Sequence, residues 1–268
     1  MSTQLSPDSE QWDAWADPTL VATYERWADP HSAELAQIAF DHAGLETGAR
    51  VLDVGTGVGG FAVLAAERKC SVLAFDSSAL MVQRTNTRLT GFADARAVQM
   101  DARVFDLDDD SFDAAFAIFS VSLMSHRDAS LREMVRVVRP GGIICLVHWA
   151  TQYGHPMFKI VLEAMEQLDL LPPGGMGHAI VPLEDDHMLA AGCVDVSVEP
   201  IGMPARLPSS STFLEELGPI FQVIPGFSDL QPTQLAALRS LITHKVGHDG
   251  SPNWNLEAIL GIGRIPSN

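Results

Sequence analysis

The sequence predicts an α/β fold in which helices cover both faces of a largely parallel sheet. The first observation is an apolar run leading into an acid and a glycine-rich turn, Val51-Leu52-Asp53-Val54-Gly55-Thr56-Gly57. The second is the apolar, alanine-rich helical pattern that follows at once, from Gly60 to Arg68. The third is that further short apolar runs alternate with helical patterns along the chain. A buried strand, a tight turn and a helix N-terminus let a nucleotide-like ligand approach bare backbone.

The segment before this strand is rich in aromatic residues. Trp12 and Trp15, and again Tyr24 and Trp27, are three residues apart and so share helical faces. Two interpretations are open: the aromatics pin a helix to the outside of the sheet, or they cover a ligand cleft. A second helix is expected over residues 32–42, with its end at Gly44.

The glycine-rich turn alone does not identify its ligand. Gly55, Gly57 and Gly60 satisfy the G-x-G-x-x-G pattern, which many dinucleotide-binding proteins share. Asp53, two residues before the first glycine, would repel a pyrophosphate over the turn. The same carboxylate would attract a sulfonium or an amino group.

Four further strands are expected before residue 150. Residues 71–76 form a second strand that ends in Asp76, and a helix begins near Ser77 or Ser78. Residues 95–101 form a third strand, and residues 111–120 a fourth that is apolar throughout and therefore buried on both faces. A helix over 131–138 and the turn Pro140-Gly141-Gly142 lead into a fifth strand over 143–147.

The C-terminal half alternates again. Helices are expected over 158–168 and 185–191, with a proline- and glycine-rich loop over 172–178 between them. A strand over 194–199 follows. Two helical patterns, 212–221 and 232–246, interrupt the chain before a last strand over 257–264.

The motif Asp53-Val54-Gly55-Thr56-Gly57-Val58-Gly59 resembles the first motif of class I S-adenosylmethionine-dependent methyltransferases. The segments ending in Asp76, in Asp101-Ala102 and in Arg139-Pro140-Gly141-Gly142 agree with that family in order and spacing. The likeness is strongest to the small-molecule branch that includes the ubiquinone and menaquinone C-methyltransferases (the methyltransferase type 11 domain). It implies a Rossmann-like, doubly wound, seven-stranded sheet with an antiparallel final hairpin, a helical N-terminal cap and a helical insertion before the last strand.

On this basis the chain divides into five parts. They are a helical cap over 1–34, an S-adenosylmethionine-binding core over 35–150, the rest of the core with the penultimate strand over 151–204, a helical lid over 205–250, and the last strand and tail over 251–268.

The expected cofactor is S-adenosyl-L-methionine, bound at the carboxyl ends of the strands. Asp53 would orient its amino-acid end, Asp76 would accept hydrogen bonds from the ribose hydroxyls, and Asp101 would accept one from the adenine amine. The glycines of the turn would make room for it. The other expected contacts are Gly55, Gly57, Gly59, Ser77, Met81, Ala102, Phe119, Ser120 and Tyr24.

The expected reaction is methyl transfer to an oxygen, nitrogen or carbon of a small organic acceptor in a covered apolar pocket. After the fourth strand, Phe119-Ser120-Val121-Ser122 lacks the acids that catechol-type enzymes use to hold a cation, so no metal is expected. His148 is the first candidate for a general base, with a structural histidine as the competing interpretation, and His126 is the second. The expected pocket residues are Trp149, Tyr153, His155, Phe213 and Phe221.

Three alternatives stay open. A NAD-dependent oxidoreductase would share the glycines and Asp76, but would carry an apolar residue in place of Asp53. An enzyme of this fold can bind S-adenosylmethionine and catalyse a pericyclic or decarboxylation step without methyl transfer. A regulatory module would bind the cofactor and catalyse nothing.

Composition restricts the partners. The formal net charge is −17, with no basic stripe, which disfavours a nucleic-acid partner. Cys70, Cys145 and Cys193 have no metal-ligand spacing and indicate reduced core residues. We expect a cytoplasmic protein with no signal peptide and no membrane span. The sequence is compatible with a homodimer.

Overall fold

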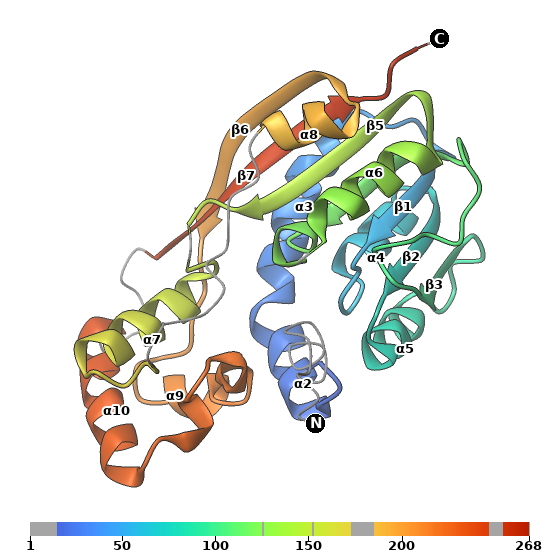
Figure 1. Ribbon diagram of the computed structural model, residues 1–268. Helices are drawn as coiled ribbons and strands as arrows, with labels where there is room; N and C mark the ends of the chain where they lie inside the picture. The colour runs from blue at the N-terminus through green and yellow to red at the C-terminus, as the bar shows by residue number, and fades with distance from the viewer. Residues whose placement is uncertain (1–14, 125, 152, 173–184, 247–253, 268) are drawn as a thin grey trace, which may run out of the picture.

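A computed structural model of the protein describes residues 15–124, 126–151, 153–172, 185–246 and 254–267. Its centre is a seven-stranded sheet with the strand order β3-β2-β1-β4-β5-β7-β6 (Figure 1). Neighbouring strands run parallel except β7, which is antiparallel to both β5 and β6. The predicted fold class is therefore confirmed, including the antiparallel final hairpin.

The strands lie where the apolar runs of the sequence predicted them, but β5 begins at Val138 and so includes the expected turn Pro140-Gly141-Gly142, and β6 extends beyond residue 199. Their bounds are β1 Arg50–Val54, β2 Ser71–Asp76, β3 Ala95–Gln99, β4 Phe112–Ile118, β5 Val138–Trp149, β6 Val194–Pro204 and β7 Asn255–Arg264.

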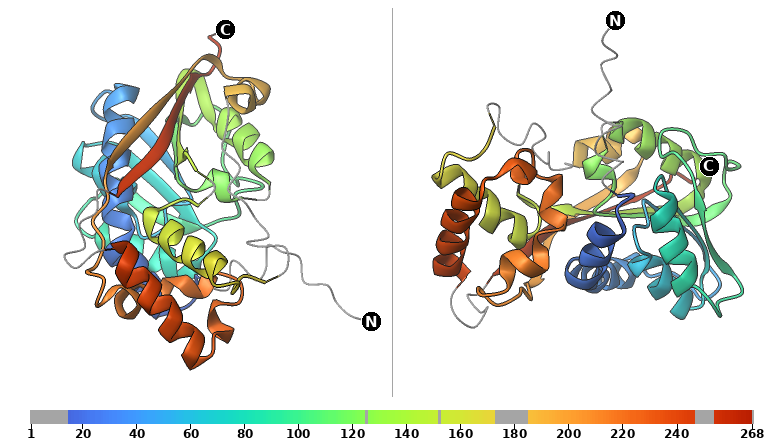
Figure 2. Two further views of the ribbon diagram at one scale, coloured as in Figure 1. Left: turned by 90° about the vertical axis from the view of Figure 1, so that its left-hand side faces the viewer. Right: turned by 90° about the horizontal axis from the view of Figure 1, so that it is seen from below.

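Helices cover the two faces of the sheet (Figures 1 and 2). One face carries α3 (Asp29–Ala43), α4 (Gly60–Glu67) and α5 (Ala79–Arg88), and the other carries α6 (Arg127–Val137) and α8 (Asp185–Ala191). Local sequence sets the ends of these helices. Gly44 ends α3 in the left-handed conformation, with φ of 59°. The Ser78 hydroxyl accepts a hydrogen bond from the Met81 amide and caps α5.

Each face of the sheet has its own apolar core, because side chains alternate along a strand. In β1, Val51 packs with α3 and α4, and Leu52 packs with α6 on the other face. Both side chains are fully buried. The sheet is therefore clamped between two helical layers, which holds the carboxyl ends of the strands in fixed positions.

A short N-terminal helix, α2 (Pro18–Trp27), stands at the carboxyl edge of the sheet. Asp17 caps it by accepting from the Thr19 amide at 2.7 Å, and Pro18 occupies its first turn. Ala28 separates α2 from α3, so the two helices meet at a joint of one residue.

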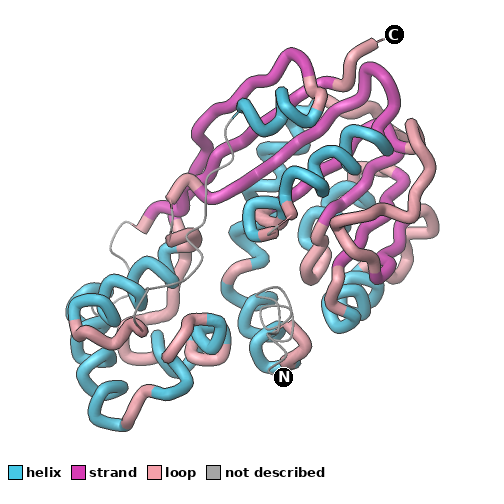
Figure 3. Tube along the Cα trace, in the orientation of Figure 1, coloured by secondary structure: helices cyan, strands magenta, loops and turns pink. Residues whose placement is uncertain are grey.

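A helical lid lies beyond the carboxyl end of β5. It consists of α7 (Pro156–Gln167), α9 (Phe213–Leu217) and α10 (Pro232–Val246), with short 3₁₀ turns over Ile220–Val223 and Phe227–Asp229. Figure 3 shows helix and loop here, in contrast to the strands of the sheet. The lid has a third apolar core of its own, to which Leu20 and Ala28 of the N-terminal segment contribute. The division of the chain into five parts stays a prediction.

Three expected elements are shorter in the structure. The third strand ends at Gln99, because the Asp101 carboxylate accepts from the Arg103 amide at 2.8 Å and turns the chain. The fourth ends at Ile118, because Phe119 is left-handed with φ of 54°. The helix expected over 212–221 breaks at Gly218 and Pro219 into α9 and a 3₁₀ turn.

Some of the residues singled out in the sequence are not described by the structure. Trp12 and residues 173–178 of the proline- and glycine-rich loop lie outside the described residues. Within the described residues, no helix combines the length and the apolar character that a membrane crossing requires.

Candidate active site

The glycine-rich turn leaves β1 at the point where the strand order reverses, between β2 on one side and β4 on the other. Open α/β sheets bind ligands in the crevice at such a point. The amides of Gly55 and Thr56 both donate to the Phe75 carbonyl, at 3.0 and 2.8 Å. The Ser120 hydroxyl donates to the Val54 carbonyl at 2.5 Å. The turn is thus tied to both neighbouring strands.

Two glycines of this turn are required by close approach as well as by conformation. Gly55 has φ of 72°, and a Cβ on it would lie 2.5 Å from the Cβ of Ser120. Gly59 has φ of 89°, and a Cβ would lie 2.8 Å from the Thr85 Cγ2. Any other residue would be strained at both positions and would push the neighbouring element away. A Cβ on Gly57, which lies between them, would make ordinary van der Waals contacts.

Asp53 lies beneath the turn with its side chain 1% exposed. Burial, together with the charge of Asp76, raises the pKa of the Asp53 carboxyl to about 7. The adjacent Thr56 hydroxyl lowers this pKa, although no hydrogen bond joins it to the carboxyl. Asp53 Oδ2 and Thr56 Oγ1 are buried and have no hydrogen-bond partner within the described structure. Such buried polar atoms are available as hydrogen-bond partners for a ligand or a water molecule.

Asp76 ends β2 and faces the same turn. Its Oδ2 accepts from the Gly57 amide and its Oδ1 from the Ser78 amide, both at 2.9 Å. Burial raises the pKa of this carboxyl, and the amide donors act against that rise. The hydroxyl of Ser77, the next residue, is buried and has no partner within the described part of the chain. Two predicted cofactor acids, Asp53 and Asp76, therefore lie close together at the glycine turn.

Helix α2 covers the turn. A Cβ on Gly57 would lie 3.6 Å from the Tyr24 ring, so Tyr24 stands directly over this glycine. Burial and the nearby Asp29 raise the pKa of the Tyr24 phenol. Trp15 contacts Tyr24 edge-on with a centroid distance of 5.3 Å, and the Ser78 hydroxyl donates to the Trp15 carbonyl at 2.9 Å. The predicted contacts Tyr24, Ser77 and Met81 are therefore brought together.

A small apolar cluster joins the cover to the turn. It comprises Val21 of α2, Val58 of the turn and Met81 of α5, all buried. Of the two interpretations of the aromatic segment, the geometry favours a cover over the cleft.

Two supports of the turn were not predicted from the sequence. The Thr85 hydroxyl, fully buried in α5, donates to the Gly57 carbonyl at 2.9 Å. Asp29 of α3 accepts from Arg88 at 2.7 Å and lies against Gly60. Arg88 also donates to the Val58 carbonyl at 2.9 Å. Thr85 follows Met81 by one helical turn, so spacing alone would place it on the same face. No local pattern marks Asp29.

Asp101 is placed differently from the other two acids. Its side chain is half exposed and is held by Arg103, whose Nε lies 2.8 Å from Oδ2. This pairing lowers the pKa of the Asp101 carboxyl. The carbonyl of Ala102 accepts from the Ser130 hydroxyl at 2.6 Å. A role for Asp101 in holding adenine would require the carboxylate to leave Arg103, so that role stays a prediction.

Aromatic rings line the ends of β4 and β5. Phe119 stacks on Trp149 with a centroid distance of 3.9 Å, and Trp149 meets the His155 ring edge-on at 6.1 Å. Left-handed backbone at a phenylalanine is strained, and such strain concentrates at functional sites. The Ser122 hydroxyl nearby in sequence is buried with no partner within the described residues.

The two candidate bases differ in environment. His148 lies in β5 with 2% of its side chain exposed, and its Nδ1 is 3.3 Å from the Trp149 carbonyl. His126 is exposed and occupies the N-terminal boundary of α6, where its carbonyl accepts from Ala129 at 2.9 Å. Only His148 belongs to the enclosed interior of the sheet.

The expected pocket residues of the lid are buried within it. Phe213 and Phe221 are fully buried and stack on each other at 5.9 Å, and Phe158 and Phe227 pack on Phe221. Tyr153 is partly buried against the same core. Phe213 and Phe221 thus shape the lid from inside.

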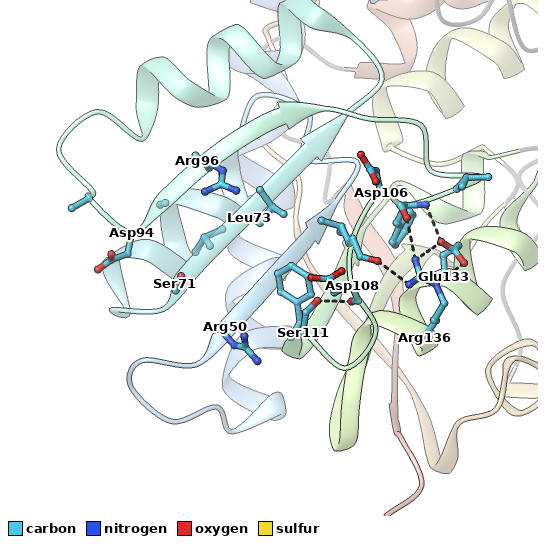
Figure 4. Close-up of a pocket in the computed structure, with 17 residues that line it drawn as sticks. Arg50, Ser71, Leu73, Asp94, Arg96, Asp106, Asp108, Ser111, Glu133 and Arg136 are labelled. Atoms are coloured by element: carbon cyan, nitrogen blue, oxygen red, sulfur yellow. Dashed lines mark hydrogen bonds and ion pairs between the residues drawn. The ribbon is translucent and has the colours of Figure 1, made fainter.

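A separate hollow of about 830 Å³ lies at the opposite end of the strands (Figure 4). Its walls include Arg50 and Ser71, the first residues of β1 and β2, and the Glu133–Arg136 ion pair of α6. The chain from β3 to β4 passes here without a described helix, which leaves this part of the sheet open. It is not the cofactor crevice, because that lies at the carboxyl ends.

Comparison with known proteins agrees with this geometry. Residues 51–142 match the family described as a methyltransferase domain. The methyltransferase GfsG of Streptomyces halstedii is 33% identical over 226 residues, which cover 79% of this chain and 77% of that protein. This chain belongs to the methyltransferase family. The predicted family membership is confirmed, and the family's cofactor is S-adenosylmethionine.

Other relatives align over shorter stretches. The ubiquinone/menaquinone biosynthesis C-methyltransferase UbiE of Hahella chejuensis is 32% identical over 55% of this chain and 62% of that protein. Uncharacterized protein Rv1405c of Mycobacterium tuberculosis is 31% identical over 51% of this chain, and the match spans 53% of its length. The chain thus spans about half the length of the mycobacterial relatives that it matches.

Solved structures share the fold. The YcgJ protein of Bacillus subtilis superposes with a TM-score of 0.58 at 18% identity, over 88% of this chain and 99% of that one. The [4+2]-cyclase SpnF superposes with a TM-score of 0.56 at 23% identity, over 88% and 81%. Likeness at these identities shows the methyltransferase fold alone.

The residues present fit S-adenosylmethionine. Asp53 Oδ2 and the Thr56 and Ser77 hydroxyls are buried polar atoms in need of partners. The glycines let the backbone of the turn lie close to Ser120, Thr85 and Tyr24. Asp76 has further lone pairs for hydroxyl donors. A cationic nucleoside derivative satisfies these groups, whereas a pyrophosphate would face the buried acid Asp53.

Proposed function

We propose that this protein transfers a methyl group from S-adenosylmethionine to a small organic acceptor, without a metal ion. The observation that carries the proposal is the β1–β4 switch point of the sheet, where buried Asp53 with an unpartnered oxygen and Asp76 flank a glycine turn. The methyltransferase relative aligned over most of its length supports it. When bound, S-adenosylmethionine supplies an activated methyl group on a sulfonium.

The chain's own residues bind, orient and exclude water. Asp53 is the partner for the amino-acid end of the cofactor, Asp76 and Ser77 for the ribose, and Tyr24 and Met81 cover it. Phe119 and Ser120 lie at the end of β4, between the glycine turn and the aromatic wall of Trp149. Because the cofactor carries the activation, positioning and exclusion of water are the protein's main task.

The acceptor would lie beyond β4 and β5, between the aromatic wall and the lid. Two methyltransferase relatives are named for hydroquinone and quinone substrates, which makes hydroquinones the first acceptor class to test. Where the acceptor must lose a proton, we assign that role to His148 rather than to the exposed His126. The segment after β4 offers a ring and hydroxyls instead of carboxylates, so chelators should not affect turnover.

Calorimetric titration with S-adenosylhomocysteine and, separately, with NAD tests the cofactor assignment. We expect binding of the first and none of the second, and an Asp76→Ala variant should weaken the first at least tenfold. Preference for NAD would refute the proposal. Labelled S-adenosylmethionine with a hydroquinone panel then tests transfer, and a product without label would indicate a non-methylating reaction instead.

A further inference from the structure

Two buried histidines meet where the N-terminal cover, the lid and the core come together. His31 is in α3, and His155 precedes the first residue of α7. Each side chain is 2% exposed. His31 Nδ1 and His155 Nε2 lie 3.2 Å apart. Both rings are enclosed, so their burial calls for a role other than direct contact with solvent or ligand.

Backbone partners fix where the ring hydrogens lie. The Arg206 amide donates to His31 Nε2 at 2.8 Å, so a neutral His31 carries its hydrogen on Nδ1, where the Trp27 carbonyl accepts at 3.0 Å. The Met157 amide donates to His155 Nδ1 at 3.2 Å, so a neutral His155 carries its hydrogen on Nε2. The two nitrogens that face each other both bear hydrogen.

This arrangement has no place for another proton. A proton added to His31 Nε2 would face the amide hydrogen of Arg206, and one added to His155 Nδ1 would face that of Met157. Protonation of either ring therefore breaks a hydrogen bond and leaves two donors in contact.

The surroundings also disfavour an imidazolium. Burial lowers the pKa of both rings, and that of His155 falls to about 3. The Arg206 guanidinium lowers the pKa of His31 further, while Glu34, which forms an ion pair with Arg206, raises it. The two rings also oppose each other's charge.

The bonds of His31 tie α2 to the start of the lid, whereas the bond of His155 is local to the first turn of α7 and its ring meets that of His31 by contact. Trp27 is the last residue of α2, Arg206 lies where the chain passes from β6 into the lid, and Met157 is in the first turn of α7. Helix α2 itself has two neighbours. Its Tyr24 stands over Gly57 of the turn, and its Leu20 belongs to the lid core.

We propose that the His31–His155 pair is a proton-sensitive joint that holds α2 over the glycine turn and fastens it to the lid, so that acid loosens the cover of the cofactor site. The inference rests on the proposed function only in that the crevice beneath α2 is the cofactor site. His31 and His155 are positioning residues, because they act through α2 and Tyr24.

Hydrogen exchange of the α2 amides in the cofactor-free protein tests the joint. Wild type and His31→Gln are compared at pH 7.5 and 5.0, after correction for intrinsic exchange rates. Glutamine keeps an acceptor for the Arg206 amide and takes up no proton. If opening of α2 returns His31 to its ordinary pKa, the opening constant of wild type divided by that of the variant should be about thirtyfold larger at pH 5.0 than at pH 7.5. Asp53 and other groups contribute equally to both proteins and cancel.

His42→Gln is the matched control. His42 is on the same helix and makes the same contact to a carbonyl four residues earlier, at 2.8 Å, but it is exposed. The opening constant of wild type divided by that of His42→Gln should be the same at pH 7.5 and 5.0. A constant ratio for His31→Gln would overturn the proposal. If that variant does not fold, His155→Asn, which retains an acceptor for the Met157 amide, should give the same thirtyfold change.

Imidazole ¹⁵N chemical shifts provide a second readout without cofactor. We expect His31 protonated on Nδ1 and His155 on Nε2 at pH 7.5, and an imidazolium in the closed protein at pH 6 would contradict the joint. Both measurements omit ligand, so their failure leaves the proposed function standing. Failure of S-adenosylhomocysteine binding would remove that function without affecting these results.

Discussion

At the scale of single residues, the most informative group is the Asp53 carboxyl. Its pKa of about 7 means that it is partly protonated at neutral pH, although it is the expected partner of a cation. Binding of a positively charged ligand favours the carboxylate, so it must release the proton.

This predicts that cofactor affinity falls with acid. Below pH 7 each bound ligand should displace up to one proton, and S-adenosylmethionine should bind about tenfold more weakly at pH 6 than at pH 8. Titrations in buffers of different ionisation enthalpy measure the proton count. Asp53→Asn should bind S-adenosylmethionine more weakly than wild type at every pH. Its affinity should also lack the part of the pH dependence that protonation of Asp53 causes in wild type. Equal slopes in the two proteins would contradict the assignment.

His148 makes the second residue-scale prediction. If it removes the acceptor proton, His148→Gln should lower kcat by about 10²–10⁴-fold, while the dissociation constant of S-adenosylhomocysteine stays unchanged. The exposed His126→Gln serves as the control and should leave kcat as it is. A parallel loss of cofactor affinity in His148→Gln would assign the residue to structure instead.

At the scale of elements, helix α5 supports the glycine turn from behind. Thr85→Val removes the donor to the Gly57 carbonyl at nearly constant volume and leaves a poorly satisfied backbone group, which costs about 1–3 kcal/mol. We expect the dissociation constant of S-adenosylhomocysteine to rise about fivefold or more, with partial retention in Thr85→Ser.

The matched control lies half a turn away on α5. The exposed Thr87 donates only to the Gln83 carbonyl of its own helix, at 2.9 Å, so Thr87→Val should not alter cofactor affinity. If the two valine variants behave alike, the turn does not depend on its bond to Thr85.

Most elements follow from local sequence, and the exceptions have identifiable causes. Apolar runs and the glycine turn predicted the sheet, and the helices over 185–191 and 232–246 were predicted to the residue. Asp101 was expected at a strand end, but its neighbour Arg103, two residues on, provides a local partner. Asp53 and Asp76 could be placed from the sequence because each lies near the carboxyl end of a recognisable apolar strand. Local patterns did not locate Asp29 or the His31–His155 pair, because these contacts join residues far apart in sequence.

At the scale of the whole molecule, buried histidines make stability depend on pH. The pKa of His155 is lower in the folded chain than the ordinary 6.5 of the unfolded chain, so below pH 6.5 only the unfolded chain gains this proton. The folded state loses stability as pH falls from 6.5 toward 3. At pH 5 the loss from His155 alone is about 2 kcal/mol relative to pH 7.5.

Urea denaturation of wild type and His155→Asn at pH 7.5 and 5.0 measures this difference. The variant should lose about 2 kcal/mol less than wild type between the two values. Asp53, whose pKa is raised, changes stability in the opposite direction over this range but does so in both proteins. An identical decline in both would show that His155 is not buried in its neutral form.

The lid has an apolar interior that is largely its own, built from two stretches of chain that join the sheet at separate points. Substitutions of Phe158, Phe221 and their neighbours therefore need not disturb the glycine-rich turn that follows β1. If the acceptor binds against the lid as proposed, changes in this part would alter the acceptor without altering the methyl donor. Chimaeras that exchange residues 156–172 and 213–246 between relatives are a practical way to redirect such a catalyst.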